Sequence, residues 1–192
     1  LYYDRPDVSG AVWEGPGPDL DELCERYGFD MVLPFEQAPS AIRLNSQAPE
    51  ALLDAVVAVR LRHDAAARSQ LEQAVDMTVR AHFQAMRATR PERREFQILA
   101  TLLVSVTQEG GATSFTPIVS RRGEILHIPH YDGTLQKGDL LLVDFGAENR
   151  EGWAGDLTRT FPVRTTFSPR QAEIYELVLR AQKAALVECR PG

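Results

Sequence analysis

Cysteine is scarce in this sequence, and its two copies are too far apart to act together. They are Cys24 and Cys189, in a chain of 192 residues. A disulfide framework needs more cysteines than this, and a structural zinc site needs closely spaced Cys and His. The scarcity argues against both, and it favours two reduced cysteines in a cytoplasmic protein.

Long apolar runs and an excess of positive charge are also missing. The longest apolar run lies near 98–106, and crossing a bilayer takes about 20 residues. No signal-peptide pattern is present. The formal net charge is −6, whereas nucleic acids and anionic membranes attract basic surfaces. We therefore expect neither nucleic acid nor membrane among the partners of this protein.

No internal repeat divides the chain, but its composition changes near the beginning. Residues 1–50 are rich in Pro, Gly and Asp, and they include a turn followed by a short helix with Asp19 as its N-cap. This segment is short for an independent core. A domain boundary is therefore expected near 45–57.

The middle of the chain carries a helical pattern. Between 57 and 89, apolar residues recur at spacings of three and four, which predicts one long helix with a buried stripe. Pro91 ends this helix, because proline is tolerated in the first turn of a helix but not inside one. A second helix is expected over 92–109.

Strands follow the second helix, and their pattern predicts them at 112–119, 124–128, 140–146 and 152–163. The last two are joined by a tight turn and should pair antiparallel. Ser168 and Pro169 then open a final helix, as N-cap and first helical residue. This order predicts an α+β fold with helices on one face of an antiparallel sheet.

Two aspartates flank the turn of the predicted hairpin. Asp144 ends the apolar run LLLV, so its Cα should lie inside the sheet, and Asp156 follows the turn. In a hairpin of this length, both side chains can point to one face from neighbouring strands. Carboxylates so close repel each other unless a cation lies between them, which predicts a divalent metal site. Oxygen ligands suit manganese, magnesium and calcium, and they also accept zinc or cobalt.

Two interpretations without a metal remain open for these carboxylates. Asp156 can be a plain turn residue while Asp144 pairs with Arg159, or the two carboxylates can act as general acid and base. Two carboxylates also leave a metal shell incomplete, and residues 157–192 contain no histidine. Further ligands are therefore needed for any metal site.

The hairpin carries a pattern that extends beyond its two aspartates. It contains DFGAE at 144–148 and then WAGDLTRTFP at 153–162. This pattern resembles the signature of the pita-bread metallopeptidases, in particular aminopeptidase P and prolidase, although its turn is one residue longer than in commoner members. AHFQAMRATRP at 81–91 and the segment 167–192 are also similar to the family, and WEGPGP at 13–18 and YGFD at 27–30 resemble the end of its amino-terminal domain. The resemblance thus covers nearly the whole chain.

This resemblance implies a fold and a division of the chain. Residues 51–192 would be the first half of a pita-bread (creatinase/aminopeptidase-like) catalytic domain, which is an α+β fold. Residues 1–50 would be the tail of a small α/β amino-terminal domain. The family's other metal ligands, a His and two Glu, come from its second half, which has no counterpart in this sequence. We therefore expect a partial sequence that cannot hold a catalytic metal pair alone.

The resemblance also implies an activity, which is hydrolysis of the peptide bond between an amino-terminal residue and proline. Asp144 would bind one of two divalent ions, and Asp156 would bridge both. The expected ions are manganese, with zinc or cobalt as alternatives, and they would convert a bridging water to hydroxide near neutral pH. The substrate would be a proline-containing peptide or dipeptide. A homodimer or higher homo-oligomer is expected, because relatives commonly form such assemblies.

Two histidines in GEILHIPHYDG are candidates for the family's substrate-binding histidine. His127 stands 11 residues before Gly138, which fits the family spacing, whereas the distance from Val119 suits His130. We prefer His127 as the catalytic residue, which would bind substrate and move a proton, and keep His130 as substrate-binding. His82 lies on the helical stripe and is predicted to be a hydrogen-bonded core residue.

Other functions can use the same fold. A non-catalytic pita-bread protein would bind a partner or peptide, but it does not need buried paired carboxylates. An enzyme acting on creatine-like small molecules would not be expected to keep Asp144 and Asp156. Retention of both aspartates and His127 favours the Xaa-Pro peptidase, with a binding protein or an inactive fragment as the alternative.

Overall fold

The computed structural model describes residues 1–3, 17–38, 49–125, 127–128, 130–163 and 166–190. The chain divides into two compact units, Leu1–Arg62 and His63–Gly192. The four site residues predicted from the sequence all lie in the second unit.

The first unit contains short helices and little core. Helix α2 (Leu20–Tyr27) begins where predicted, because the Asp19 carboxylate accepts a hydrogen bond from the Glu22 N–H at 2.7 Å. It ends at Gly28, whose φ of +67° is a left-handed conformation that favours glycine. The other elements are η1 (Phe35–Gln37) and α3 (Glu50–Arg60).

Helices α4 (Ala65–Ala88) and α5 (Glu95–Gln108) pack against each other in the second unit. The single helix predicted over 57–89 is wrong, because α3 and α4 are separate helices. Asp64 starts α4 by accepting the Ala67 N–H at 2.7 Å, and such capping competes with a continuous helix. Most buried side chains of α4 are small, which allows close packing: Ala74, Met77, Thr78, Ala81, His82 and Ala85.

The strands form a three-stranded antiparallel sheet, in the order β2-β3-β5, and a two-stranded one that pairs β1 with β4. Pairing of β3 with β5 confirms the predicted hairpin. The strand predicted at 124–128 is wrong for the described residues of this range, which exclude residue 126, because the Ile125 N–H closes a turn on the Arg122 carbonyl. The strands are β1 (Ala112–Thr113), β2 (Ile118–Ser120), β3 (Leu140–Phe145), β4 (Ala147–Glu148) and β5 (Leu157–Pro162).

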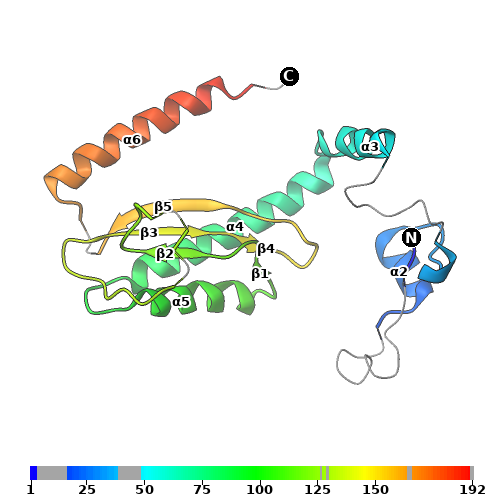
Figure 1. Ribbon diagram of the computed structural model, residues 1–192, viewed down its shortest axis with the longest axis horizontal. Coiled ribbons are helices and arrows are strands. Elements are labelled where there is room, and N and C mark those ends of the chain that lie inside the picture. The colour runs from blue at the N-terminus through cyan, green and yellow to red at the C-terminus, as the bar shows by residue number, and fades with distance from the viewer. Residues whose placement is uncertain (4–16, 39–48, 126, 129, 164–165, 191–192) are drawn as a thin grey trace. The chain divides into compact units, whose positions relative to one another are not determined.

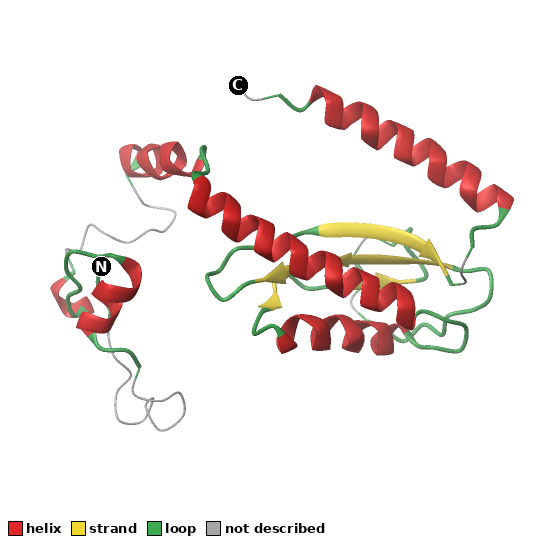
Figure 2. Cartoon of the chain, turned by 180° about the vertical axis from the view of Figure 1, so that it is seen from behind, coloured by secondary structure: helices red, strands yellow, loops and turns green. Residues whose placement is uncertain are grey.

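Helices α4 and α5 cover one face of the three-stranded sheet, as Figure 1 shows from one side and Figure 2 from behind. Leu141, Val143 and Phe145 point to this face and are fully buried. Because side chains alternate along a strand, Leu142 and Asp144 point to the opposite face. The predicted α+β arrangement, with helices on one face of an antiparallel sheet, is confirmed.

The last helix, α6 (Pro169–Glu188), begins as predicted from Ser168. The Ser168 hydroxyl accepts the Gln171 N–H at 3.3 Å, and the Gln171 side chain accepts the Ser168 N–H at 2.9 Å. This reciprocal pair is a capping box. Within the described parts of the chain, no helix combines the length and the apolar character that crossing a membrane requires.

Candidate metal centre

Asp144 lies in the central strand, on the face that α4 and α5 leave uncovered. It pairs with Ile118 of β2 and Thr158 of β5, so a strand flanks it on each side. The Thr158 hydroxyl donates to Asp144 Oδ1 at 2.7 Å. This contact orients the carboxylate and leaves its Oδ2 atom without a hydrogen bond to the described residues. The sequence contained one clue to Thr158, namely its position two residues after Asp156.

The alternative pairing of Asp144 with Arg159 is wrong. Arg159 pairs with Val143, so strand alternation sends its side chain to the other face of the sheet. The Arg159 guanidinium instead donates to the Thr158 carbonyl at 2.7 Å. The Asp144 carboxylate is therefore not paired with the Arg159 guanidinium, and a metal ion remains the favoured partner.

The register of the hairpin places Asp156 on the same face as Asp144. The residue pairs before and after Asp156 follow the same antiparallel register between the two strands. This register places Asp156 opposite Gly146 and diagonally from Asp144. Diagonal neighbours of this kind are roughly 7–8 Å apart, measured between Cα atoms. Their side chains are therefore close enough to contact the same metal centre. The flanking pairs are Phe145–Leu157 and Glu148–Ala154.

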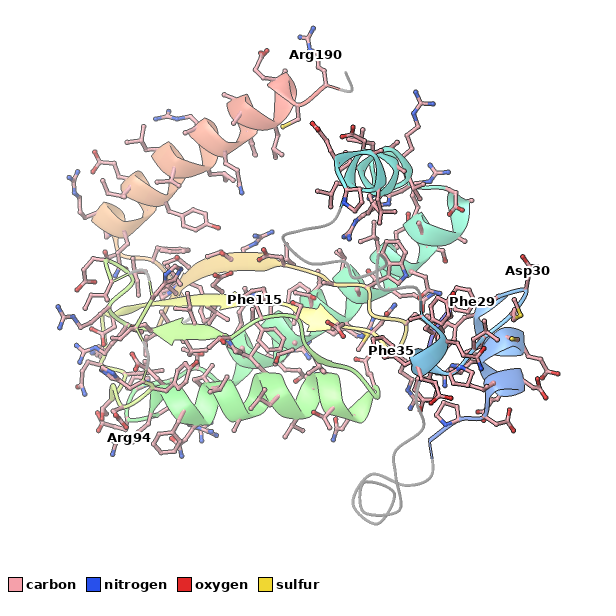
Figure 3. All side chains as sticks on the ribbon, turned by 45° about the vertical axis from the view of Figure 1, so that its right-hand side comes forward. Phe29, Asp30, Phe35, Arg94, Phe115 and Arg190 are labelled. Atoms are coloured by element: carbon pink, nitrogen blue, oxygen red, sulfur yellow. The ribbon has the colours of Figure 1, made fainter. Side chains whose placement is uncertain are left out.

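Two glycines let neighbouring backbones come close beside the aspartates. A Cβ on Gly155 would lie 2.4 Å from Thr78 Oγ1, and one on Gly146 would lie 2.0 Å from the Gly155 carbonyl oxygen. The ring of Phe115, labelled in Figure 3, would also be only 2.8 Å from a Cβ on Gly146. Any larger residue at either position would therefore displace the strand segments that carry Asp144 and Asp156.

Side chains from two other segments hold the hairpin in place. The buried Thr78 hydroxyl accepts the Ala147 N–H at 2.9 Å and donates to the Ala74 carbonyl at 2.8 Å. The Ser114 hydroxyl donates to the Gly155 carbonyl at 2.8 Å. Thr78 lies on the helical stripe predicted over 57–89, which gave no sign of this role, and no sequence pattern pointed to Ser114.

His127 and His130 lie in an exposed loop that follows β2. A Cβ on Gly123 would lie 3.0 Å from the Leu142 side chain, so the loop begins on the same sheet face as Asp144. In the described part of the chain, neither histidine forms a hydrogen bond or ion pair with Asp144 or Asp156. Their roles, and the preference for His127, stay predictions.

Tyr131 attaches the end of this loop to the segment before β2. Its hydroxyl donates to the Pro117 carbonyl at 2.5 Å. Burial raises the pKa of the Tyr131 hydroxyl above its ordinary value of 10.0. The hydroxyl therefore remains a hydrogen-bond donor at neutral pH.

The prediction that His82 is a hydrogen-bonded core residue is confirmed. Only 3% of His82 is exposed, and its Nδ1 atom lies 3.0 Å from the Thr78 carbonyl oxygen. A carbonyl only accepts, so Nδ1 carries the proton. Nε2 has no hydrogen-bond partner among the described residues. The ring packs edge-on against Phe145, on the helix side of the sheet, whereas Asp144 faces the other side.

The donor chemistry of Asp144 and Asp156 fits part of the shell of a divalent metal ion. Carboxylate oxygens suit hard divalent ions. Asp156 is exposed and Asp144 is half-buried, so an ion can reach both. Among the residues that the structure describes, no group of three or more His, Cys, Asp or Glu side chains is arranged to hold a metal. The two aspartates are therefore an incomplete ligand set.

Comparison with known sequences points to one family. The sequence profile of metallopeptidase family M24 matches residues 69–192. The Xaa-Pro aminopeptidase of Haemophilus influenzae is 42% identical over 125 residues, which is 64% of this chain and 29% of that protein. The Xaa-Pro aminopeptidase of Escherichia coli is 34% identical over 97% of this chain and 51% of its own length.

Comparison with solved structures points to the same family. Proline aminopeptidase P II from Yersinia pestis superposes with a TM-score of 0.79 at 28% identity, covering 100% of this chain and 53% of that one. A variant of Escherichia coli aminopeptidase P in complex with substrate gives a TM-score of 0.80 at 27% identity, with 100% and 52% covered. The predicted pita-bread fold is confirmed. The chain spans 29% to 53% of the length of these four proteins.

Proposed function

The chain belongs to metallopeptidase family M24, and we propose that it forms part of a metal-dependent enzyme that hydrolyses the peptide bond between an amino-terminal residue and proline. The observation that carries this proposal is the location of Asp144 and Asp156 on one open sheet face, within the matched residues. Relatives named Xaa-Pro aminopeptidase support the substrate class.

In this proposal, Asp144 and Asp156 hold two divalent ions, with manganese as the physiological metal. When bound, such ions polarise a substrate carbonyl and lower the pKa of a coordinated water. The Thr158 hydroxyl fixes the direction of the Asp144 carboxylate. A His and two Glu from sequence outside these 192 residues complete the ligand set, as the family resemblance implies.

The loop after β2 supplies the groups that handle the substrate. We assign His127 to substrate binding and proton transfer, because a neutral imidazole can donate or accept a proton near pH 7. His130 is assigned to substrate binding. Both are exposed and therefore accessible to a peptide.

The proposal also covers the oligomeric state of the protein and its cellular location. A homodimer or higher homo-oligomer is proposed from the family resemblance alone. A cytoplasmic location is supported by Cys24 and Cys189, which are both free cysteines. Sedimentation of the purified protein and fractionation of the source cells test these two points.

The first experiment measures the intact mass and the metal content per chain of the natural protein. About two divalent ions per chain, together with cleavage of Xaa-Pro peptides and not of matched Xaa-Ala peptides, would support the proposal. A series of peptide lengths then separates an aminopeptidase from a dipeptidase. A metal-loaded protein that leaves every Xaa-Pro peptide intact would contradict the proposed activity.

Variants at the two aspartates link this activity to the site. Asp144→Asn and Asp156→Asn should each lower kcat/KM by about 100-fold or more, since changes outside the ligand set already cost 10–100-fold. Asp76→Asn on the exposed surface of α4 is the matched control and should keep full activity. Equal activity in all three variants would exclude a metal-binding role for the aspartates.

A further inference from the structure

Glu95 is a buried carboxylate that no motif in the sequence explains. It is the first residue of α5, and only 2% of it is exposed. Its Oε1 atom accepts the Arg121 N–H at 2.8 Å, and its Oε2 atom accepts the Gly133 N–H at 2.9 Å. Its own N–H donates to the Gly133 carbonyl at 2.9 Å. One side chain therefore contacts two backbone positions that are distant in sequence.

These two positions are the ends of the loop that carries His127 and His130. Arg121 directly follows β2, and Gly133 comes shortly after His130. The Glu95 carboxylate accepts a hydrogen bond from each end of the loop and so holds the two ends together, which we call closure of the loop neck. The neighbours of Glu95 add to this attachment. The Phe96 N–H donates to the Tyr131 carbonyl at 3.0 Å, and the guanidinium of Arg94, labelled in Figure 3, donates to the Asp132 carbonyl at 3.0 Å.

The contacts of Glu95 are not those of an ion pair. The nearby Arg121 guanidinium pairs with Asp139 instead. The position at the first turn of α5 favours a negative charge, because the N–H groups of a helix start carry partial positive charge. Burying a carboxylate without a cation is costly, but a hydrophobic residue at this position would leave the Arg121 and Gly133 N–H groups without their acceptor. A carboxylate, however, is the side chain that offers two acceptors to two separate N–H donors.

We propose that Glu95 is a positioning residue that closes the loop of His127 and thereby sets the position of this histidine toward the substrate. The inference rests on the proposed function only for the part played by His127. Closure of the loop neck by Glu95 is a property of the fold and can be measured without any activity.

Glu95→Gln in the complete, metal-loaded protein tests this role with little change in size. Glutamine keeps one acceptor oxygen, but its amide group would face an N–H donor at the other position. We expect amide hydrogen exchange over 121–133 to accelerate at least about tenfold. We also expect kcat/KM for an Xaa-Pro peptide to fall about tenfold to a hundredfold. Metal content should remain unchanged.

Glu109→Gln is the matched control, because Glu109 lies at the other end of α5 in an exposed ion pair with Arg80. It should change neither the exchange over 121–133 nor kcat/KM. Gly133→Ala is a second variant that leaves Glu95 in place. Its Cβ would lie 2.5 Å from Glu95 Oε1, so it should push the carboxylate off its donors and reproduce both effects.

A double-variant cycle with His127→Ala separates positioning from general stability. If Glu95 acts through His127, Glu95→Gln should reduce kcat/KM little or not at all in the His127→Ala background. Fully additive losses would overturn the inference, since a purely structural role affects both backgrounds equally. Unchanged exchange over 121–133 in Glu95→Gln would also overturn it.

The same experiments distinguish failure of the inference from failure of the proposed function. A wild-type protein without Xaa-Pro hydrolysis refutes the proposed function, and the exchange data still decide whether Glu95 closes the loop. An active wild type whose Glu95→Gln variant keeps full kcat/KM refutes only the inference.

Discussion

The direction of the Asp144 carboxylate depends on one hydroxyl from the neighbouring strand. Thr158 donates to Oδ1 at 2.7 Å, and this leaves Oδ2 available on the uncovered face of the sheet. If Asp144 binds a metal ion as proposed, Thr158 should influence its metal affinity, because losing a partner that orients a ligand typically costs about 10–100-fold.

Thr158→Val should weaken metal binding in the complete protein by about tenfold to a hundredfold, because it removes the hydroxyl and keeps the shape of the side chain. Isothermal titration with Mn²⁺ measures this change directly. Thr160→Val is the control, since Thr160 lies two residues along the same strand, opposite Leu142. Equal affinities in the two variants would show that the Thr158 hydroxyl has no part in metal binding.

Tyr131→Phe should lower the stability by about 1 kcal/mol at pH 8, because one hydrogen bond to the Pro117 carbonyl is lost. Burial raises the folded-state pKa of Tyr131 above 10.0. The hydroxyl's contribution is therefore fully present below about pH 10 and is lost as the pH rises through the folded-state pKa. Urea unfolding of both proteins across this range should show their difference shrinking. A difference that stays constant as the pH rises above about 10 would contradict this assignment.

At the scale of helices and strands, α4 contacts and supports the hairpin from the sheet face opposite the two aspartates. Thr78 Oγ1 binds the Ala147 N–H, and Gly155 packs against the same hydroxyl. The helix therefore supports the hairpin backbone next to Asp156, at Gly155 and at Ala147 in the opposite strand. A helix that supplies no site residue can still change the site through this contact.

Thr78→Val should destabilise the second unit by about 1–3 kcal/mol, because the buried Ala147 N–H loses its acceptor. Thr78→Ser keeps the hydroxyl and removes one methyl group, which costs about 1 kcal/mol. Urea midpoints of the two variants should therefore follow the order serine above valine. The reverse order would mean that packing of the methyl group, and not the hydrogen bond, holds α4 to the hairpin.

At the scale of the whole molecule, the two aspartates belong to a chain that spans about half of the solved structures it resembles. The core lies within the second unit, between α4, α5 and the three-stranded sheet. This core includes Leu141, Val143 and Phe145, and it fixes the strand that carries Asp144. The remaining ligands of the proposed metal site are a separate requirement.

Residues 1–192 alone should bind Mn²⁺ much more weakly than the natural protein, because two carboxylates provide only part of the usual shell of an ion of this type. Titration calorimetry on both proteins at equal pH measures the difference. Chelation should abolish activity of the natural protein, and added Mn²⁺ should restore it. Tight binding of two ions by residues 1–192 would contradict the incomplete ligand set.

The sequence by itself determined the features that depend on local pattern. Strand alternation and the turn between Asp144 and Asp156 were enough to predict one hairpin with both carboxylates on one face. The cap at Ser168 predicted the start of α6, and the apolar stripe predicted that His82 lies in the core. These predictions succeeded because hydrogen bonds and side-chain directions within a helix or hairpin follow from neighbouring residues.

Only the tertiary structure decided the contacts between distant segments. It showed that Thr78 supports Ala147, 69 residues away, and that Glu95 joins both ends of the histidine loop. Such contacts depend on how helices pack on the sheet, and no periodicity within one segment records that packing.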